Sequence, residues 1–169
     1  MILNNPYRPI LNLPKTRIER IWNYIGGGIF LLSLIYAAVS WGTLPDKIPG
    51  HFNGLGEVDR WGSKYEIIIL PIIGGFIFVL MTLFEKAPHM HNYPKRLNES
   101  NVKQFYLNSR LMLNMTKNVC LVIFALLIVQ IIRVAKGEID SLGGWFLPVF
   151  IVLVTFPIII GIYRQSKIK

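Results

Sequence analysis

The polar side chains best suited to chemistry are concentrated between residues 44 and 64, in the segment LPDKIPGHFNGLGEVDRWGSK. His51 together with Glu57 or Asp59 supplies groups that bind metal ions or transfer protons. Two or three such groups without a fixed framework do not define a metal site. Two other interpretations therefore stand beside it: these side chains cap turns and hold the segment in shape, or they recognise a ligand such as a peptide.

Turn-forming residues indicate that this segment is a compact loop or a small hairpin. Asn53-Gly54 is a strong tight-turn pair. Pro45 and Pro49 stiffen the entry, because proline fixes its own φ and restricts the residue before it. The candidate ligand-binding or loop-structuring residues are His51, Asn53, Glu57, Asp59 and Lys64.

Motifs of known catalytic activities are missing from the sequence. It contains no glycine-rich phosphate loop, no Ser/His/Asp arrangement and no HExxH motif. His89 and His91 form a His-x-His pair, which we interpret as part of a polar loop and not as a metal clamp. The single cysteine, Cys120, can form neither an internal disulfide nor a zinc site. We expect a protein that is not an enzyme and that has no cofactor and no bound metal.

Four apolar blocks surround the polar segments. The chain has 169 residues, of which 53% are hydrophobic, and a block of about 20 residues is long enough for a helix to cross a hydrocarbon core. The sequence predicts an all-α integral membrane protein with four transmembrane helices and one structured extracytoplasmic loop. The four-helix membrane domain is expected at 21–163, with helices at 21–42, 67–84, 111–134 and 143–163, the extracytoplasmic loop at 43–66 and a cytoplasmic loop at 85–110. A cytoplasmic N-terminal segment at 1–20 and a cytoplasmic tail at 164–169 complete the chain.

Local signals add detail to three of these elements. Pro71 is expected to bend the second helix, and Pro148 and Pro157 the fourth, because proline removes a backbone hydrogen bond. The third helix is expected to begin near Ser100 and to continue without a break into the third apolar block.

The distribution of basic residues predicts the orientation in the membrane. Most of the 18 Lys and Arg residues lie in the N-terminal segment, in the second loop with the helix start that follows it, and in the C-terminal tail. Because cytoplasmic segments are enriched in Lys and Arg, both termini are predicted to be cytoplasmic, and residues 44–64 face outward. The expected location is the bacterial cytoplasmic membrane. Basic residues that flank apolar blocks indicate contact with the lipid bilayer, and we expect no nucleic-acid partner.

A stripe of polar residues marks the start of the third apolar block. Arg110, Asn114 and Lys117 are spaced i, i+4 and i+7, so they share one helix face. Lys117 either snorkels to the lipid headgroups, which we favour, or marks a pathway or partner site. The candidate residues for a cytoplasmic partner or lipid face are Asn92, Tyr93, Arg110, Asn114 and Lys117.

The order of several motifs carries a resemblance. The sequence LPDKIP at 44–49 is followed by HFN at 51–53, GE at 56–57 and DRWGSK at 59–64, and NYP at 92–94 precedes Tyr106, Asn108, Arg110, Met112 and Leu113. These residues closely resemble the signature of a bacterial membrane-domain family of unknown function. That domain also forms the N-terminal part of Sdp-type (sporulation-delaying toxin) immunity proteins, which protect cells from a toxic peptide. The resemblance covers residues 20–120 and implies the membrane fold and location.

The resemblance has limits that bear on function. The longer immunity proteins continue with further membrane helices and a motif of their own, which this sequence lacks. The resemblance to those proteins implies toxin immunity and the capture of a cytoplasmic repressor at the membrane. Nothing in the residues of this chain points to that repressor directly.

Three functions remain open from the sequence. The first is an integral membrane protein that binds or senses an antimicrobial peptide or another envelope ligand through its outer loop, in an immunity-like role. The second is a small transporter or transporter subunit, with kinked helices lining a path. The third is a membrane metalloenzyme built on His51, Glu57 and Asp59. We favour the first, and the third is the least favoured.

Overall fold

The computed structural model describes residues 7–169, and this part of the chain is mainly helical. Four of its helices are long and apolar enough to cross a membrane, as predicted. Two strands and three short 3-10 helices connect them. The elements are α1 (Arg17–Ser40), a 3-10 helix (Trp41–Thr43), β1 (Lys47–Phe52), β2 (Val58–Ser63), a 3-10 helix (Lys64–Ile68), α2 (Ile69–Lys86), a 3-10 helix (Pro88–Met90), α3 (Val102–Ala135) and α4 (Phe146–Lys167).

Side-chain caps set where two of the membrane segments begin. Thr16 accepts a hydrogen bond from the backbone N–H of Glu19, while the Glu19 carboxylate accepts one from the backbone of Thr16. Ser63 and Glu66 form the same reciprocal cap at the 3-10 helix that leads into α2. These caps satisfy backbone donors that have no partner within the helix, so α1 begins four residues before the predicted boundary.

The three prolines expected to bend helices differ in where they lie within them. Pro71 and Pro148 are each the third residue of their helix, where a missing N–H breaks no intrahelical hydrogen bond. Pro157 is the proline inside α4, and the helix continues through it. Helix α2 also follows directly on the 3-10 helix Lys64–Ile68, so the bend predicted at Pro71 stays a prediction.

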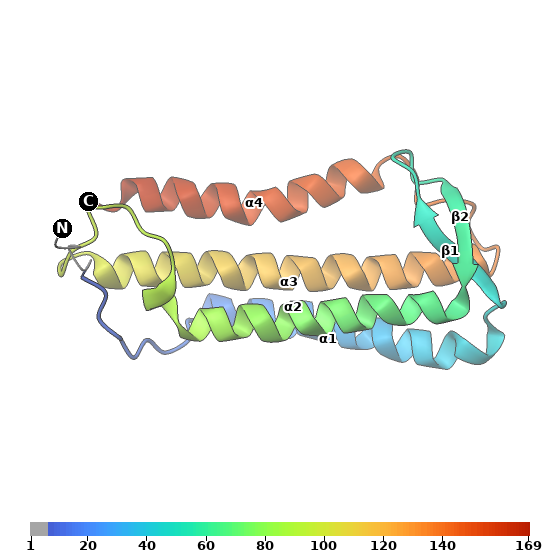
Figure 1. Ribbon diagram of the computed structural model, residues 1–169, viewed down its shortest axis with the longest axis horizontal. Helices are drawn as coiled ribbons and strands as arrows, with labels where there is room; N and C mark the ends of the chain where they lie inside the picture. Colours follow the sequence, from blue (N-terminus) through green and yellow to red (C-terminus); the bar gives the residue numbers. More distant parts are fainter. Residues whose placement is uncertain (1–6) are drawn as a thin grey trace, which may run out of the picture.

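Helix α3 lies at the centre of the bundle. Within residues 7–169, every pair of long helices in extensive contact includes α3, which packs against α1, α2 and α4. With 34 residues it is about 50 Å long at 1.5 Å per residue. Residues 102–110, expected to be part of a loop, form its first turns, in line with the predicted helix start near Ser100. The other three helices are arranged around α3 (Figure 1).

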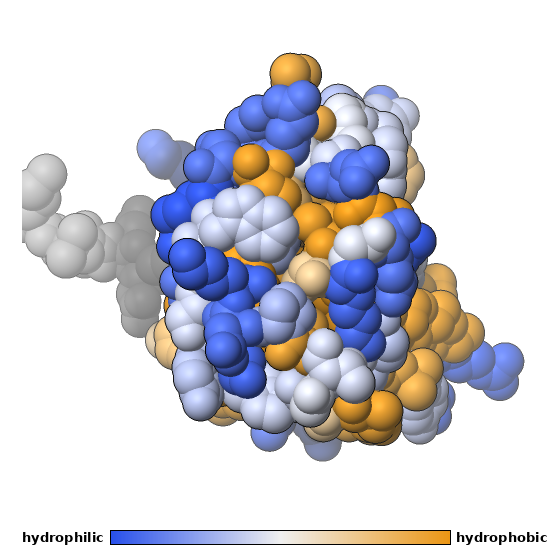
Figure 2. All heavy atoms as spheres, turned by 90° about the vertical axis from the view of Figure 1, so that its right-hand side faces the viewer, coloured by the Kyte–Doolittle hydropathy of each residue, from blue (hydrophilic) through white to orange (hydrophobic). Residues whose placement is uncertain are grey.

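The two ends of the bundle differ. The β-hairpin lies at one end, which we call the hairpin end, and the C-terminus lies at the other together with the segment preceding α1, which we call the terminal end (Figure 1). Hydrophilic residues are interspersed with hydrophobic ones over the hairpin end (Figure 2). The four candidate spans indicate an integral membrane protein.

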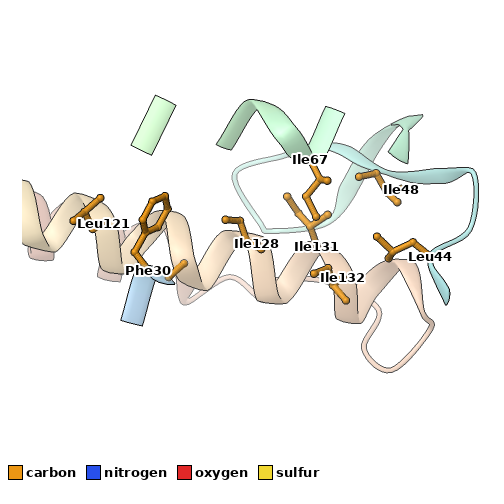
Figure 3. Close-up of a cluster of buried hydrophobic side chains, with 9 residues drawn as sticks. Phe30, Leu44, Ile48, Ile67, Leu121, Ile128, Ile131 and Ile132 are labelled. Atoms are coloured by element: carbon orange, nitrogen blue, oxygen red, sulfur yellow. The ribbon is translucent and has the colours of Figure 1, made fainter. Parts of the chain in front are cut away.

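The main apolar core extends towards the hairpin end. Ile48 of β1 and Ile67 pack against Ile131 and Ile132 of α3, and Phe30 of α1 packs near Leu121 in the same cluster (Figure 3). Ile48, at 1% exposure, is among the most buried side chains. The hairpin is thus anchored to α3 by its own apolar residues.

Candidate functional site

Residues 47–63 fold as an antiparallel hairpin whose tip is organised by Asn53. Strands β1 and β2 pair from Lys47 opposite Ser63 to Phe52 opposite Val58. The Asn53 Oδ1 atom accepts hydrogen bonds from the backbone of Leu55 and Glu57, and its Nδ2 donates to the Glu57 carboxylate at 2.9 Å. These bonds are those of an Asn side chain mimicking a backbone turn.

The side chains of His51 and Asp59 meet on the exposed face of the hairpin, although the strand register places Arg60 opposite His51. The His51 Nδ1 and Asp59 Oδ1 atoms are 2.7 Å apart, and the His51 side chain is 65% exposed. A carboxylate at Nδ1 orients the imidazole and leaves Nε2 free at the surface. The pair can therefore offer a fixed hydrogen-bonding group to a ligand.

Further ion pairs fasten the base of the hairpin. Arg60 donates to the Glu66 carboxylate at 2.8 Å and to the Gly50 carbonyl at 2.6 Å. The bond to Glu66 raises the pKa of Arg60 above its ordinary value. Lys64 lies 3.2 Å from the Asp46 carboxylate and over the Trp41 ring.

The hairpin tip also touches the loop before α4. The backbone N–H of Leu142 donates to the Gly56 carbonyl at 2.8 Å. Gly56 has a φ of 79°, and a Cβ added there would lie 2.7 Å from the Gly143 carbonyl oxygen. Only glycine satisfies both conditions at low cost, so this contact fixes the hairpin against the start of α4.

An apolar cavity of about 320 Å³ lies beneath the hairpin. Leu127 and Ile131 of α3 line one side, and Phe146, Leu147 and Phe150 of α4 line the other. Residues 49–53 of β1 and the turn form its edge, with His51 and Asn53 as polar groups among apolar ones. The cavity is of the type that accepts apolar groups of a ligand, with a few polar atoms to orient them.

A second polar cluster lies buried towards the terminal end. Arg110 of α3 forms a two-pronged ion pair with Glu19 of α1, with Nε–Oε1 and Nη2–Oε2 distances of 2.6 and 3.0 Å. Its guanidinium also donates to the carbonyls of Leu13 and Pro14. Arg110 and Glu19 are almost completely buried, so this pair joins α1, α3 and the segment before α1.

Lys117 takes part in the same cluster. Its Nζ lies 2.6 Å from the Glu85 carboxylate of α2, and both side chains are 1% exposed. It also donates to the Thr82 hydroxyl and lies over the Phe78 ring. Lys15 approaches the other oxygen of Glu85 at 3.3 Å. The favoured expectation that Lys117 snorkels to the headgroups is wrong, because Glu85 compensates its charge inside the protein.

Three asparagines continue the cluster into the bundle. The Asn23 Oδ1 atom of α1 accepts hydrogen bonds from Asn114 and Asn118 of α3, at 2.9 and 3.0 Å. Asn114 also donates to Glu85. A Cβ at Gly26 would lie 2.5 Å from the Asn118 side chain, so glycine there permits the close approach of α1 to α3.

The stripe on α3 is thus placed differently from the expectation. Arg110, Asn114 and Lys117 share one face, as their spacing predicts, but that face is buried against α1 and α2. They do not present an exposed surface to lipid or to a partner. Sequence reasoning missed Glu19 and Glu85, although each is an acidic residue next to an apolar block at the same end as Arg110 and Lys117.

Tyr93 belongs to a separate, half-buried network, while Asn92 is exposed. The Tyr93 hydroxyl lies 2.7 Å from both the Pro88 carbonyl and the Ser109 hydroxyl. His91 contacts Ser109 through Nδ1 and the Phe84 carbonyl through Nε2. Burial raises the pKa of Tyr93 to about 12 and lowers the pKa of His91. Both side chains therefore act as neutral hydrogen-bonding groups at neutral pH.

Possible metal ligands are dispersed over the described part of the chain. Among residues 7–169, no three His, Cys, Asp or Glu side chains lie close enough together to hold a metal ion. His51 and Asp59 are paired with each other, while Glu57 is engaged by Asn53.

Comparison with known proteins gives one domain match. Residues 28–75 match DUF1648, a domain of unknown function. The matched segment contains most of α1, the whole hairpin and the start of α2, so the hairpin lies at its centre. DUF1648 covers less than a third of this chain, and its description names no activity.

One archaeal protein is a distant relative. An uncharacterised protein of Archaeoglobus fulgidus is 30% identical over 76 residues, which are 44% of this chain and 40% of that protein. The match thus spans less than half of the relative's length. No solved structure matches the chain.

Proposed function

We propose that this protein is an integral membrane binding protein that accepts the apolar side chains of a membrane-active peptide beneath its hairpin. The apolar cavity between β1, α3 and α4 carries this proposal. Its volume of about 320 Å³ is at the lower end of ligand pockets. It therefore suits one or two large side chains of a peptide better than a whole cofactor.

The hairpin supplies polar groups next to this cavity. The sheet has two strands, so each strand has one edge without a strand partner, and most of β2 is exposed. An extended peptide can add to such an edge through backbone hydrogen bonds. The free Nε2 of His51 and the Asp59 carboxylate offer further contacts within reach of the same edge.

The proposed orientation places the hairpin outside the cytoplasm. Basic residues dominate the exposed surface at the terminal end, and cytoplasmic segments are typically enriched in Lys and Arg. Three segments lie at that end: residues 7–20, residues 85–110 and residues 164–169. Among the described residues of these segments, Glu99 is the one exposed acidic residue. The exposed basic residues there are Lys15, Arg17, Arg20, Lys86, Lys95, Arg96, Lys103, Arg164, Lys167 and Lys169.

An immunity-like role is the finer form of this proposal. It is supported by the resemblance of the hairpin motif to the N-terminal domain of Sdp-type immunity proteins. In that role the hairpin end would sequester a toxic peptide from the outside. The basic terminal end would be the surface available to a cytoplasmic repressor.

Growth of a peptide-sensitive bacterial host tests the proposal. The chain is expressed in the host, and growth is measured against a panel of cationic membrane-active peptides. Expression is expected to protect against at least one peptide. Leu147→Trp, which fills the cavity, is expected to abolish that protection, whereas Leu32→Trp on the exposed face of α1 leaves it intact.

Two outcomes contradict the proposal. Protection against no peptide in the panel rules out the immunity-like form. Equal protection by the Leu147→Trp and Leu32→Trp variants, at equal amounts of membrane-inserted protein, shows that the cavity is not the peptide site.

Transport is the second candidate, because one observation favours it. The Lys117–Glu85 pair is an ionisable pair buried between two membrane helices, and such groups often belong to ion or proton pathways. Flux of protons or small solutes into proteoliposomes measures this directly. A Glu85→Gln variant that inserts normally but loses flux would support transport, and flux equal to that of empty liposomes would exclude it.

A further inference from the structure

A separate groove lies at the terminal end, away from the hairpin. It has a volume of about 410 Å³ and lies between the start of α1, the first turns of α3 and the end of α4. Its apolar lining includes Ile18, Leu107 and Leu111, and its polar lining includes Gln104 and Arg164. The groove is separate from the cavity under the hairpin and from the buried charge cluster.

The polarity of the groove changes along α3. Gln104 lies in the first turn of α3, and Leu107 and Leu111 follow one and two turns further into the bundle. These positions share one helix face because they are spaced by three and four residues. The mouth of the groove is therefore polar where the helix emerges from the apolar zone, and its floor becomes apolar towards the membrane interior.

Two donor side chains at the mouth are available to a ligand. Within residues 7–169, the side chains of Arg164 and Gln104 form no hydrogen bond or ion pair with the protein. The neighbouring end of α4 is held in place by Arg96, which donates to the carbonyls of Gln165 and Ile168. Arg164 is thus a charged group on a fixed helix end, without an acidic partner.

We propose that this groove binds one anionic glycerophospholipid, with the phosphate at Arg164 and an acyl chain over Leu107 and Leu111. Charge complementarity selects this occupant. The exposed surface at this end is basic, while the acidic side chains of Glu19 and Glu85 are buried and already paired. A guanidinium binds a phosphate through paired hydrogen bonds, and the apolar floor matches a hydrocarbon chain.

Native mass spectrometry of the purified full chain tests this inference. The protein in mild detergent is incubated with phosphatidylglycerol or with phosphatidylcholine, and the lipid retained per protein molecule is measured. Wild type is expected to retain phosphatidylglycerol preferentially. Arg164→Gln is expected to reduce that retention about fivefold, the factor for removing one basic side chain from an anionic lipid surface.

The matched control is Arg20→Gln. Arg20 is also an exposed arginine at this end, but it does not line the groove. The Arg20→Gln variant is expected to retain as much phosphatidylglycerol as wild type does. Leu107→Trp, which fills the floor without changing the charge, is expected to reduce retention as well. Circular dichroism establishes that each variant keeps the helix content of wild type.

Three results overturn the proposal. The first is equal retention of the two lipids by wild type, and the second is unchanged retention by Arg164→Gln. The third is an equal loss in Arg164→Gln and Arg20→Gln, which indicates diffuse attraction to a basic surface. None of these results depends on whether the hairpin cavity binds a peptide.

Discussion

The hairpin end and the buried charge cluster use ion pairs in opposite ways. The His51–Asp59 pair joins residues eight apart in sequence and is exposed, whereas the Arg110–Glu19 pair joins residues 91 apart and is buried. Exposed pairs contribute about 0–1 kcal/mol to stability. Removing one partner of a buried pair costs about 3–5 kcal/mol, because the remaining charge is left uncompensated.

This difference separates residues that hold the hairpin in shape from residues that hold the helices together. The polar residues of the hairpin act within the hairpin or on its immediate neighbours, so each can be replaced at a small cost to the bundle. The polar residues of the cluster connect α1, α2 and α3, so each replacement affects how the helices pack. A ligand-binding surface can vary in the first region, but not in the second.

The largest expected effect is the loss of Arg110. Arg110→Met leaves the Glu19 carboxylate buried without its partner and removes the bonds to the Leu13 and Pro14 carbonyls. We expect a loss of about 3–5 kcal/mol, measured as unfolding by a denaturing detergent. The control is Arg17→Met, which removes an exposed arginine from the first turn of α1, the helix that carries Glu19. Its free energy of unfolding is expected to change little. Equal stability of the two variants would contradict the comparison.

The Lys117–Glu85 pair provides a sharper test through a double variant. Lys117→Met alone and Glu85→Gln alone are each expected to destabilise the protein strongly. The two together are expected to cost less than the sum of the single changes, because no buried charge of this pair remains. Unfolding measurements on all four proteins give the coupling. Strict additivity would show that the two side chains are independent.

An intermediate effect is expected where the hairpin meets the loop before α4. Gly56→Ala places a Cβ 2.7 Å from the Gly143 carbonyl oxygen at a φ of 79°. A non-glycine residue in such a conformation costs about 1–3 kcal/mol. The neighbouring Gly54→Ala is the matched control, since its Cβ would meet only Leu147 at 4.0 Å. Thermal unfolding compares the two, and an identical midpoint would show that the contact is not needed.

A smaller effect is expected from acidification, through His91. Its pKa is lowered by burial, so the folded protein binds a proton there less readily than the unfolded chain. The neutral form stabilises the fold above a pH of about 6.5, the ordinary pKa of histidine. That stability is lost as the pH falls through the lower pKa of the folded state. His91→Gln is expected to flatten the dependence of stability on pH between 7 and 5, and an unchanged dependence would assign it to other groups.

The smallest effect on stability is expected at His51 and Asp59. His51→Ala and Asp59→Asn are each expected to change the free energy of unfolding by less than about 1 kcal/mol. The proposed peptide protection is expected to fall in both variants at unchanged protein levels. A loss of stability comparable to that of Arg110→Met would reverse the comparison between the two regions.

Local patterns were enough to predict the hairpin and the helices. The Asn53-Gly54 pair indicated a tight turn, and the structure shows the Asn53 side chain organising it. The apolar blocks indicated four spans, and the polar start of the third indicated a helix that continues across its boundary. These features depend on neighbouring residues, so they are visible in the sequence.

The buried charge cluster could not be predicted in the same way. Spacing alone placed Arg110, Asn114 and Lys117 on one face, but it did not show what that face meets. Their partners Glu19 and Glu85 come from helices distant in sequence, and only the docking of α1 and α2 on α3 brings them together. The cavity under the hairpin was equally beyond the sequence, because a cavity forms only after the helices pack.

The central position of α3 has a consequence for synthesis. The ribosome makes α1, the hairpin and α2 first, and these two helices have no extensive contact with each other. Until α3 is inserted, the carboxylates of Glu19 and Glu85 have neither Arg110 nor Lys117 to neutralise them. Insertion of α3 is therefore the step that allows α1 and α2 to pack into the bundle. A nascent chain halted before residue 102 is expected to remain unassembled.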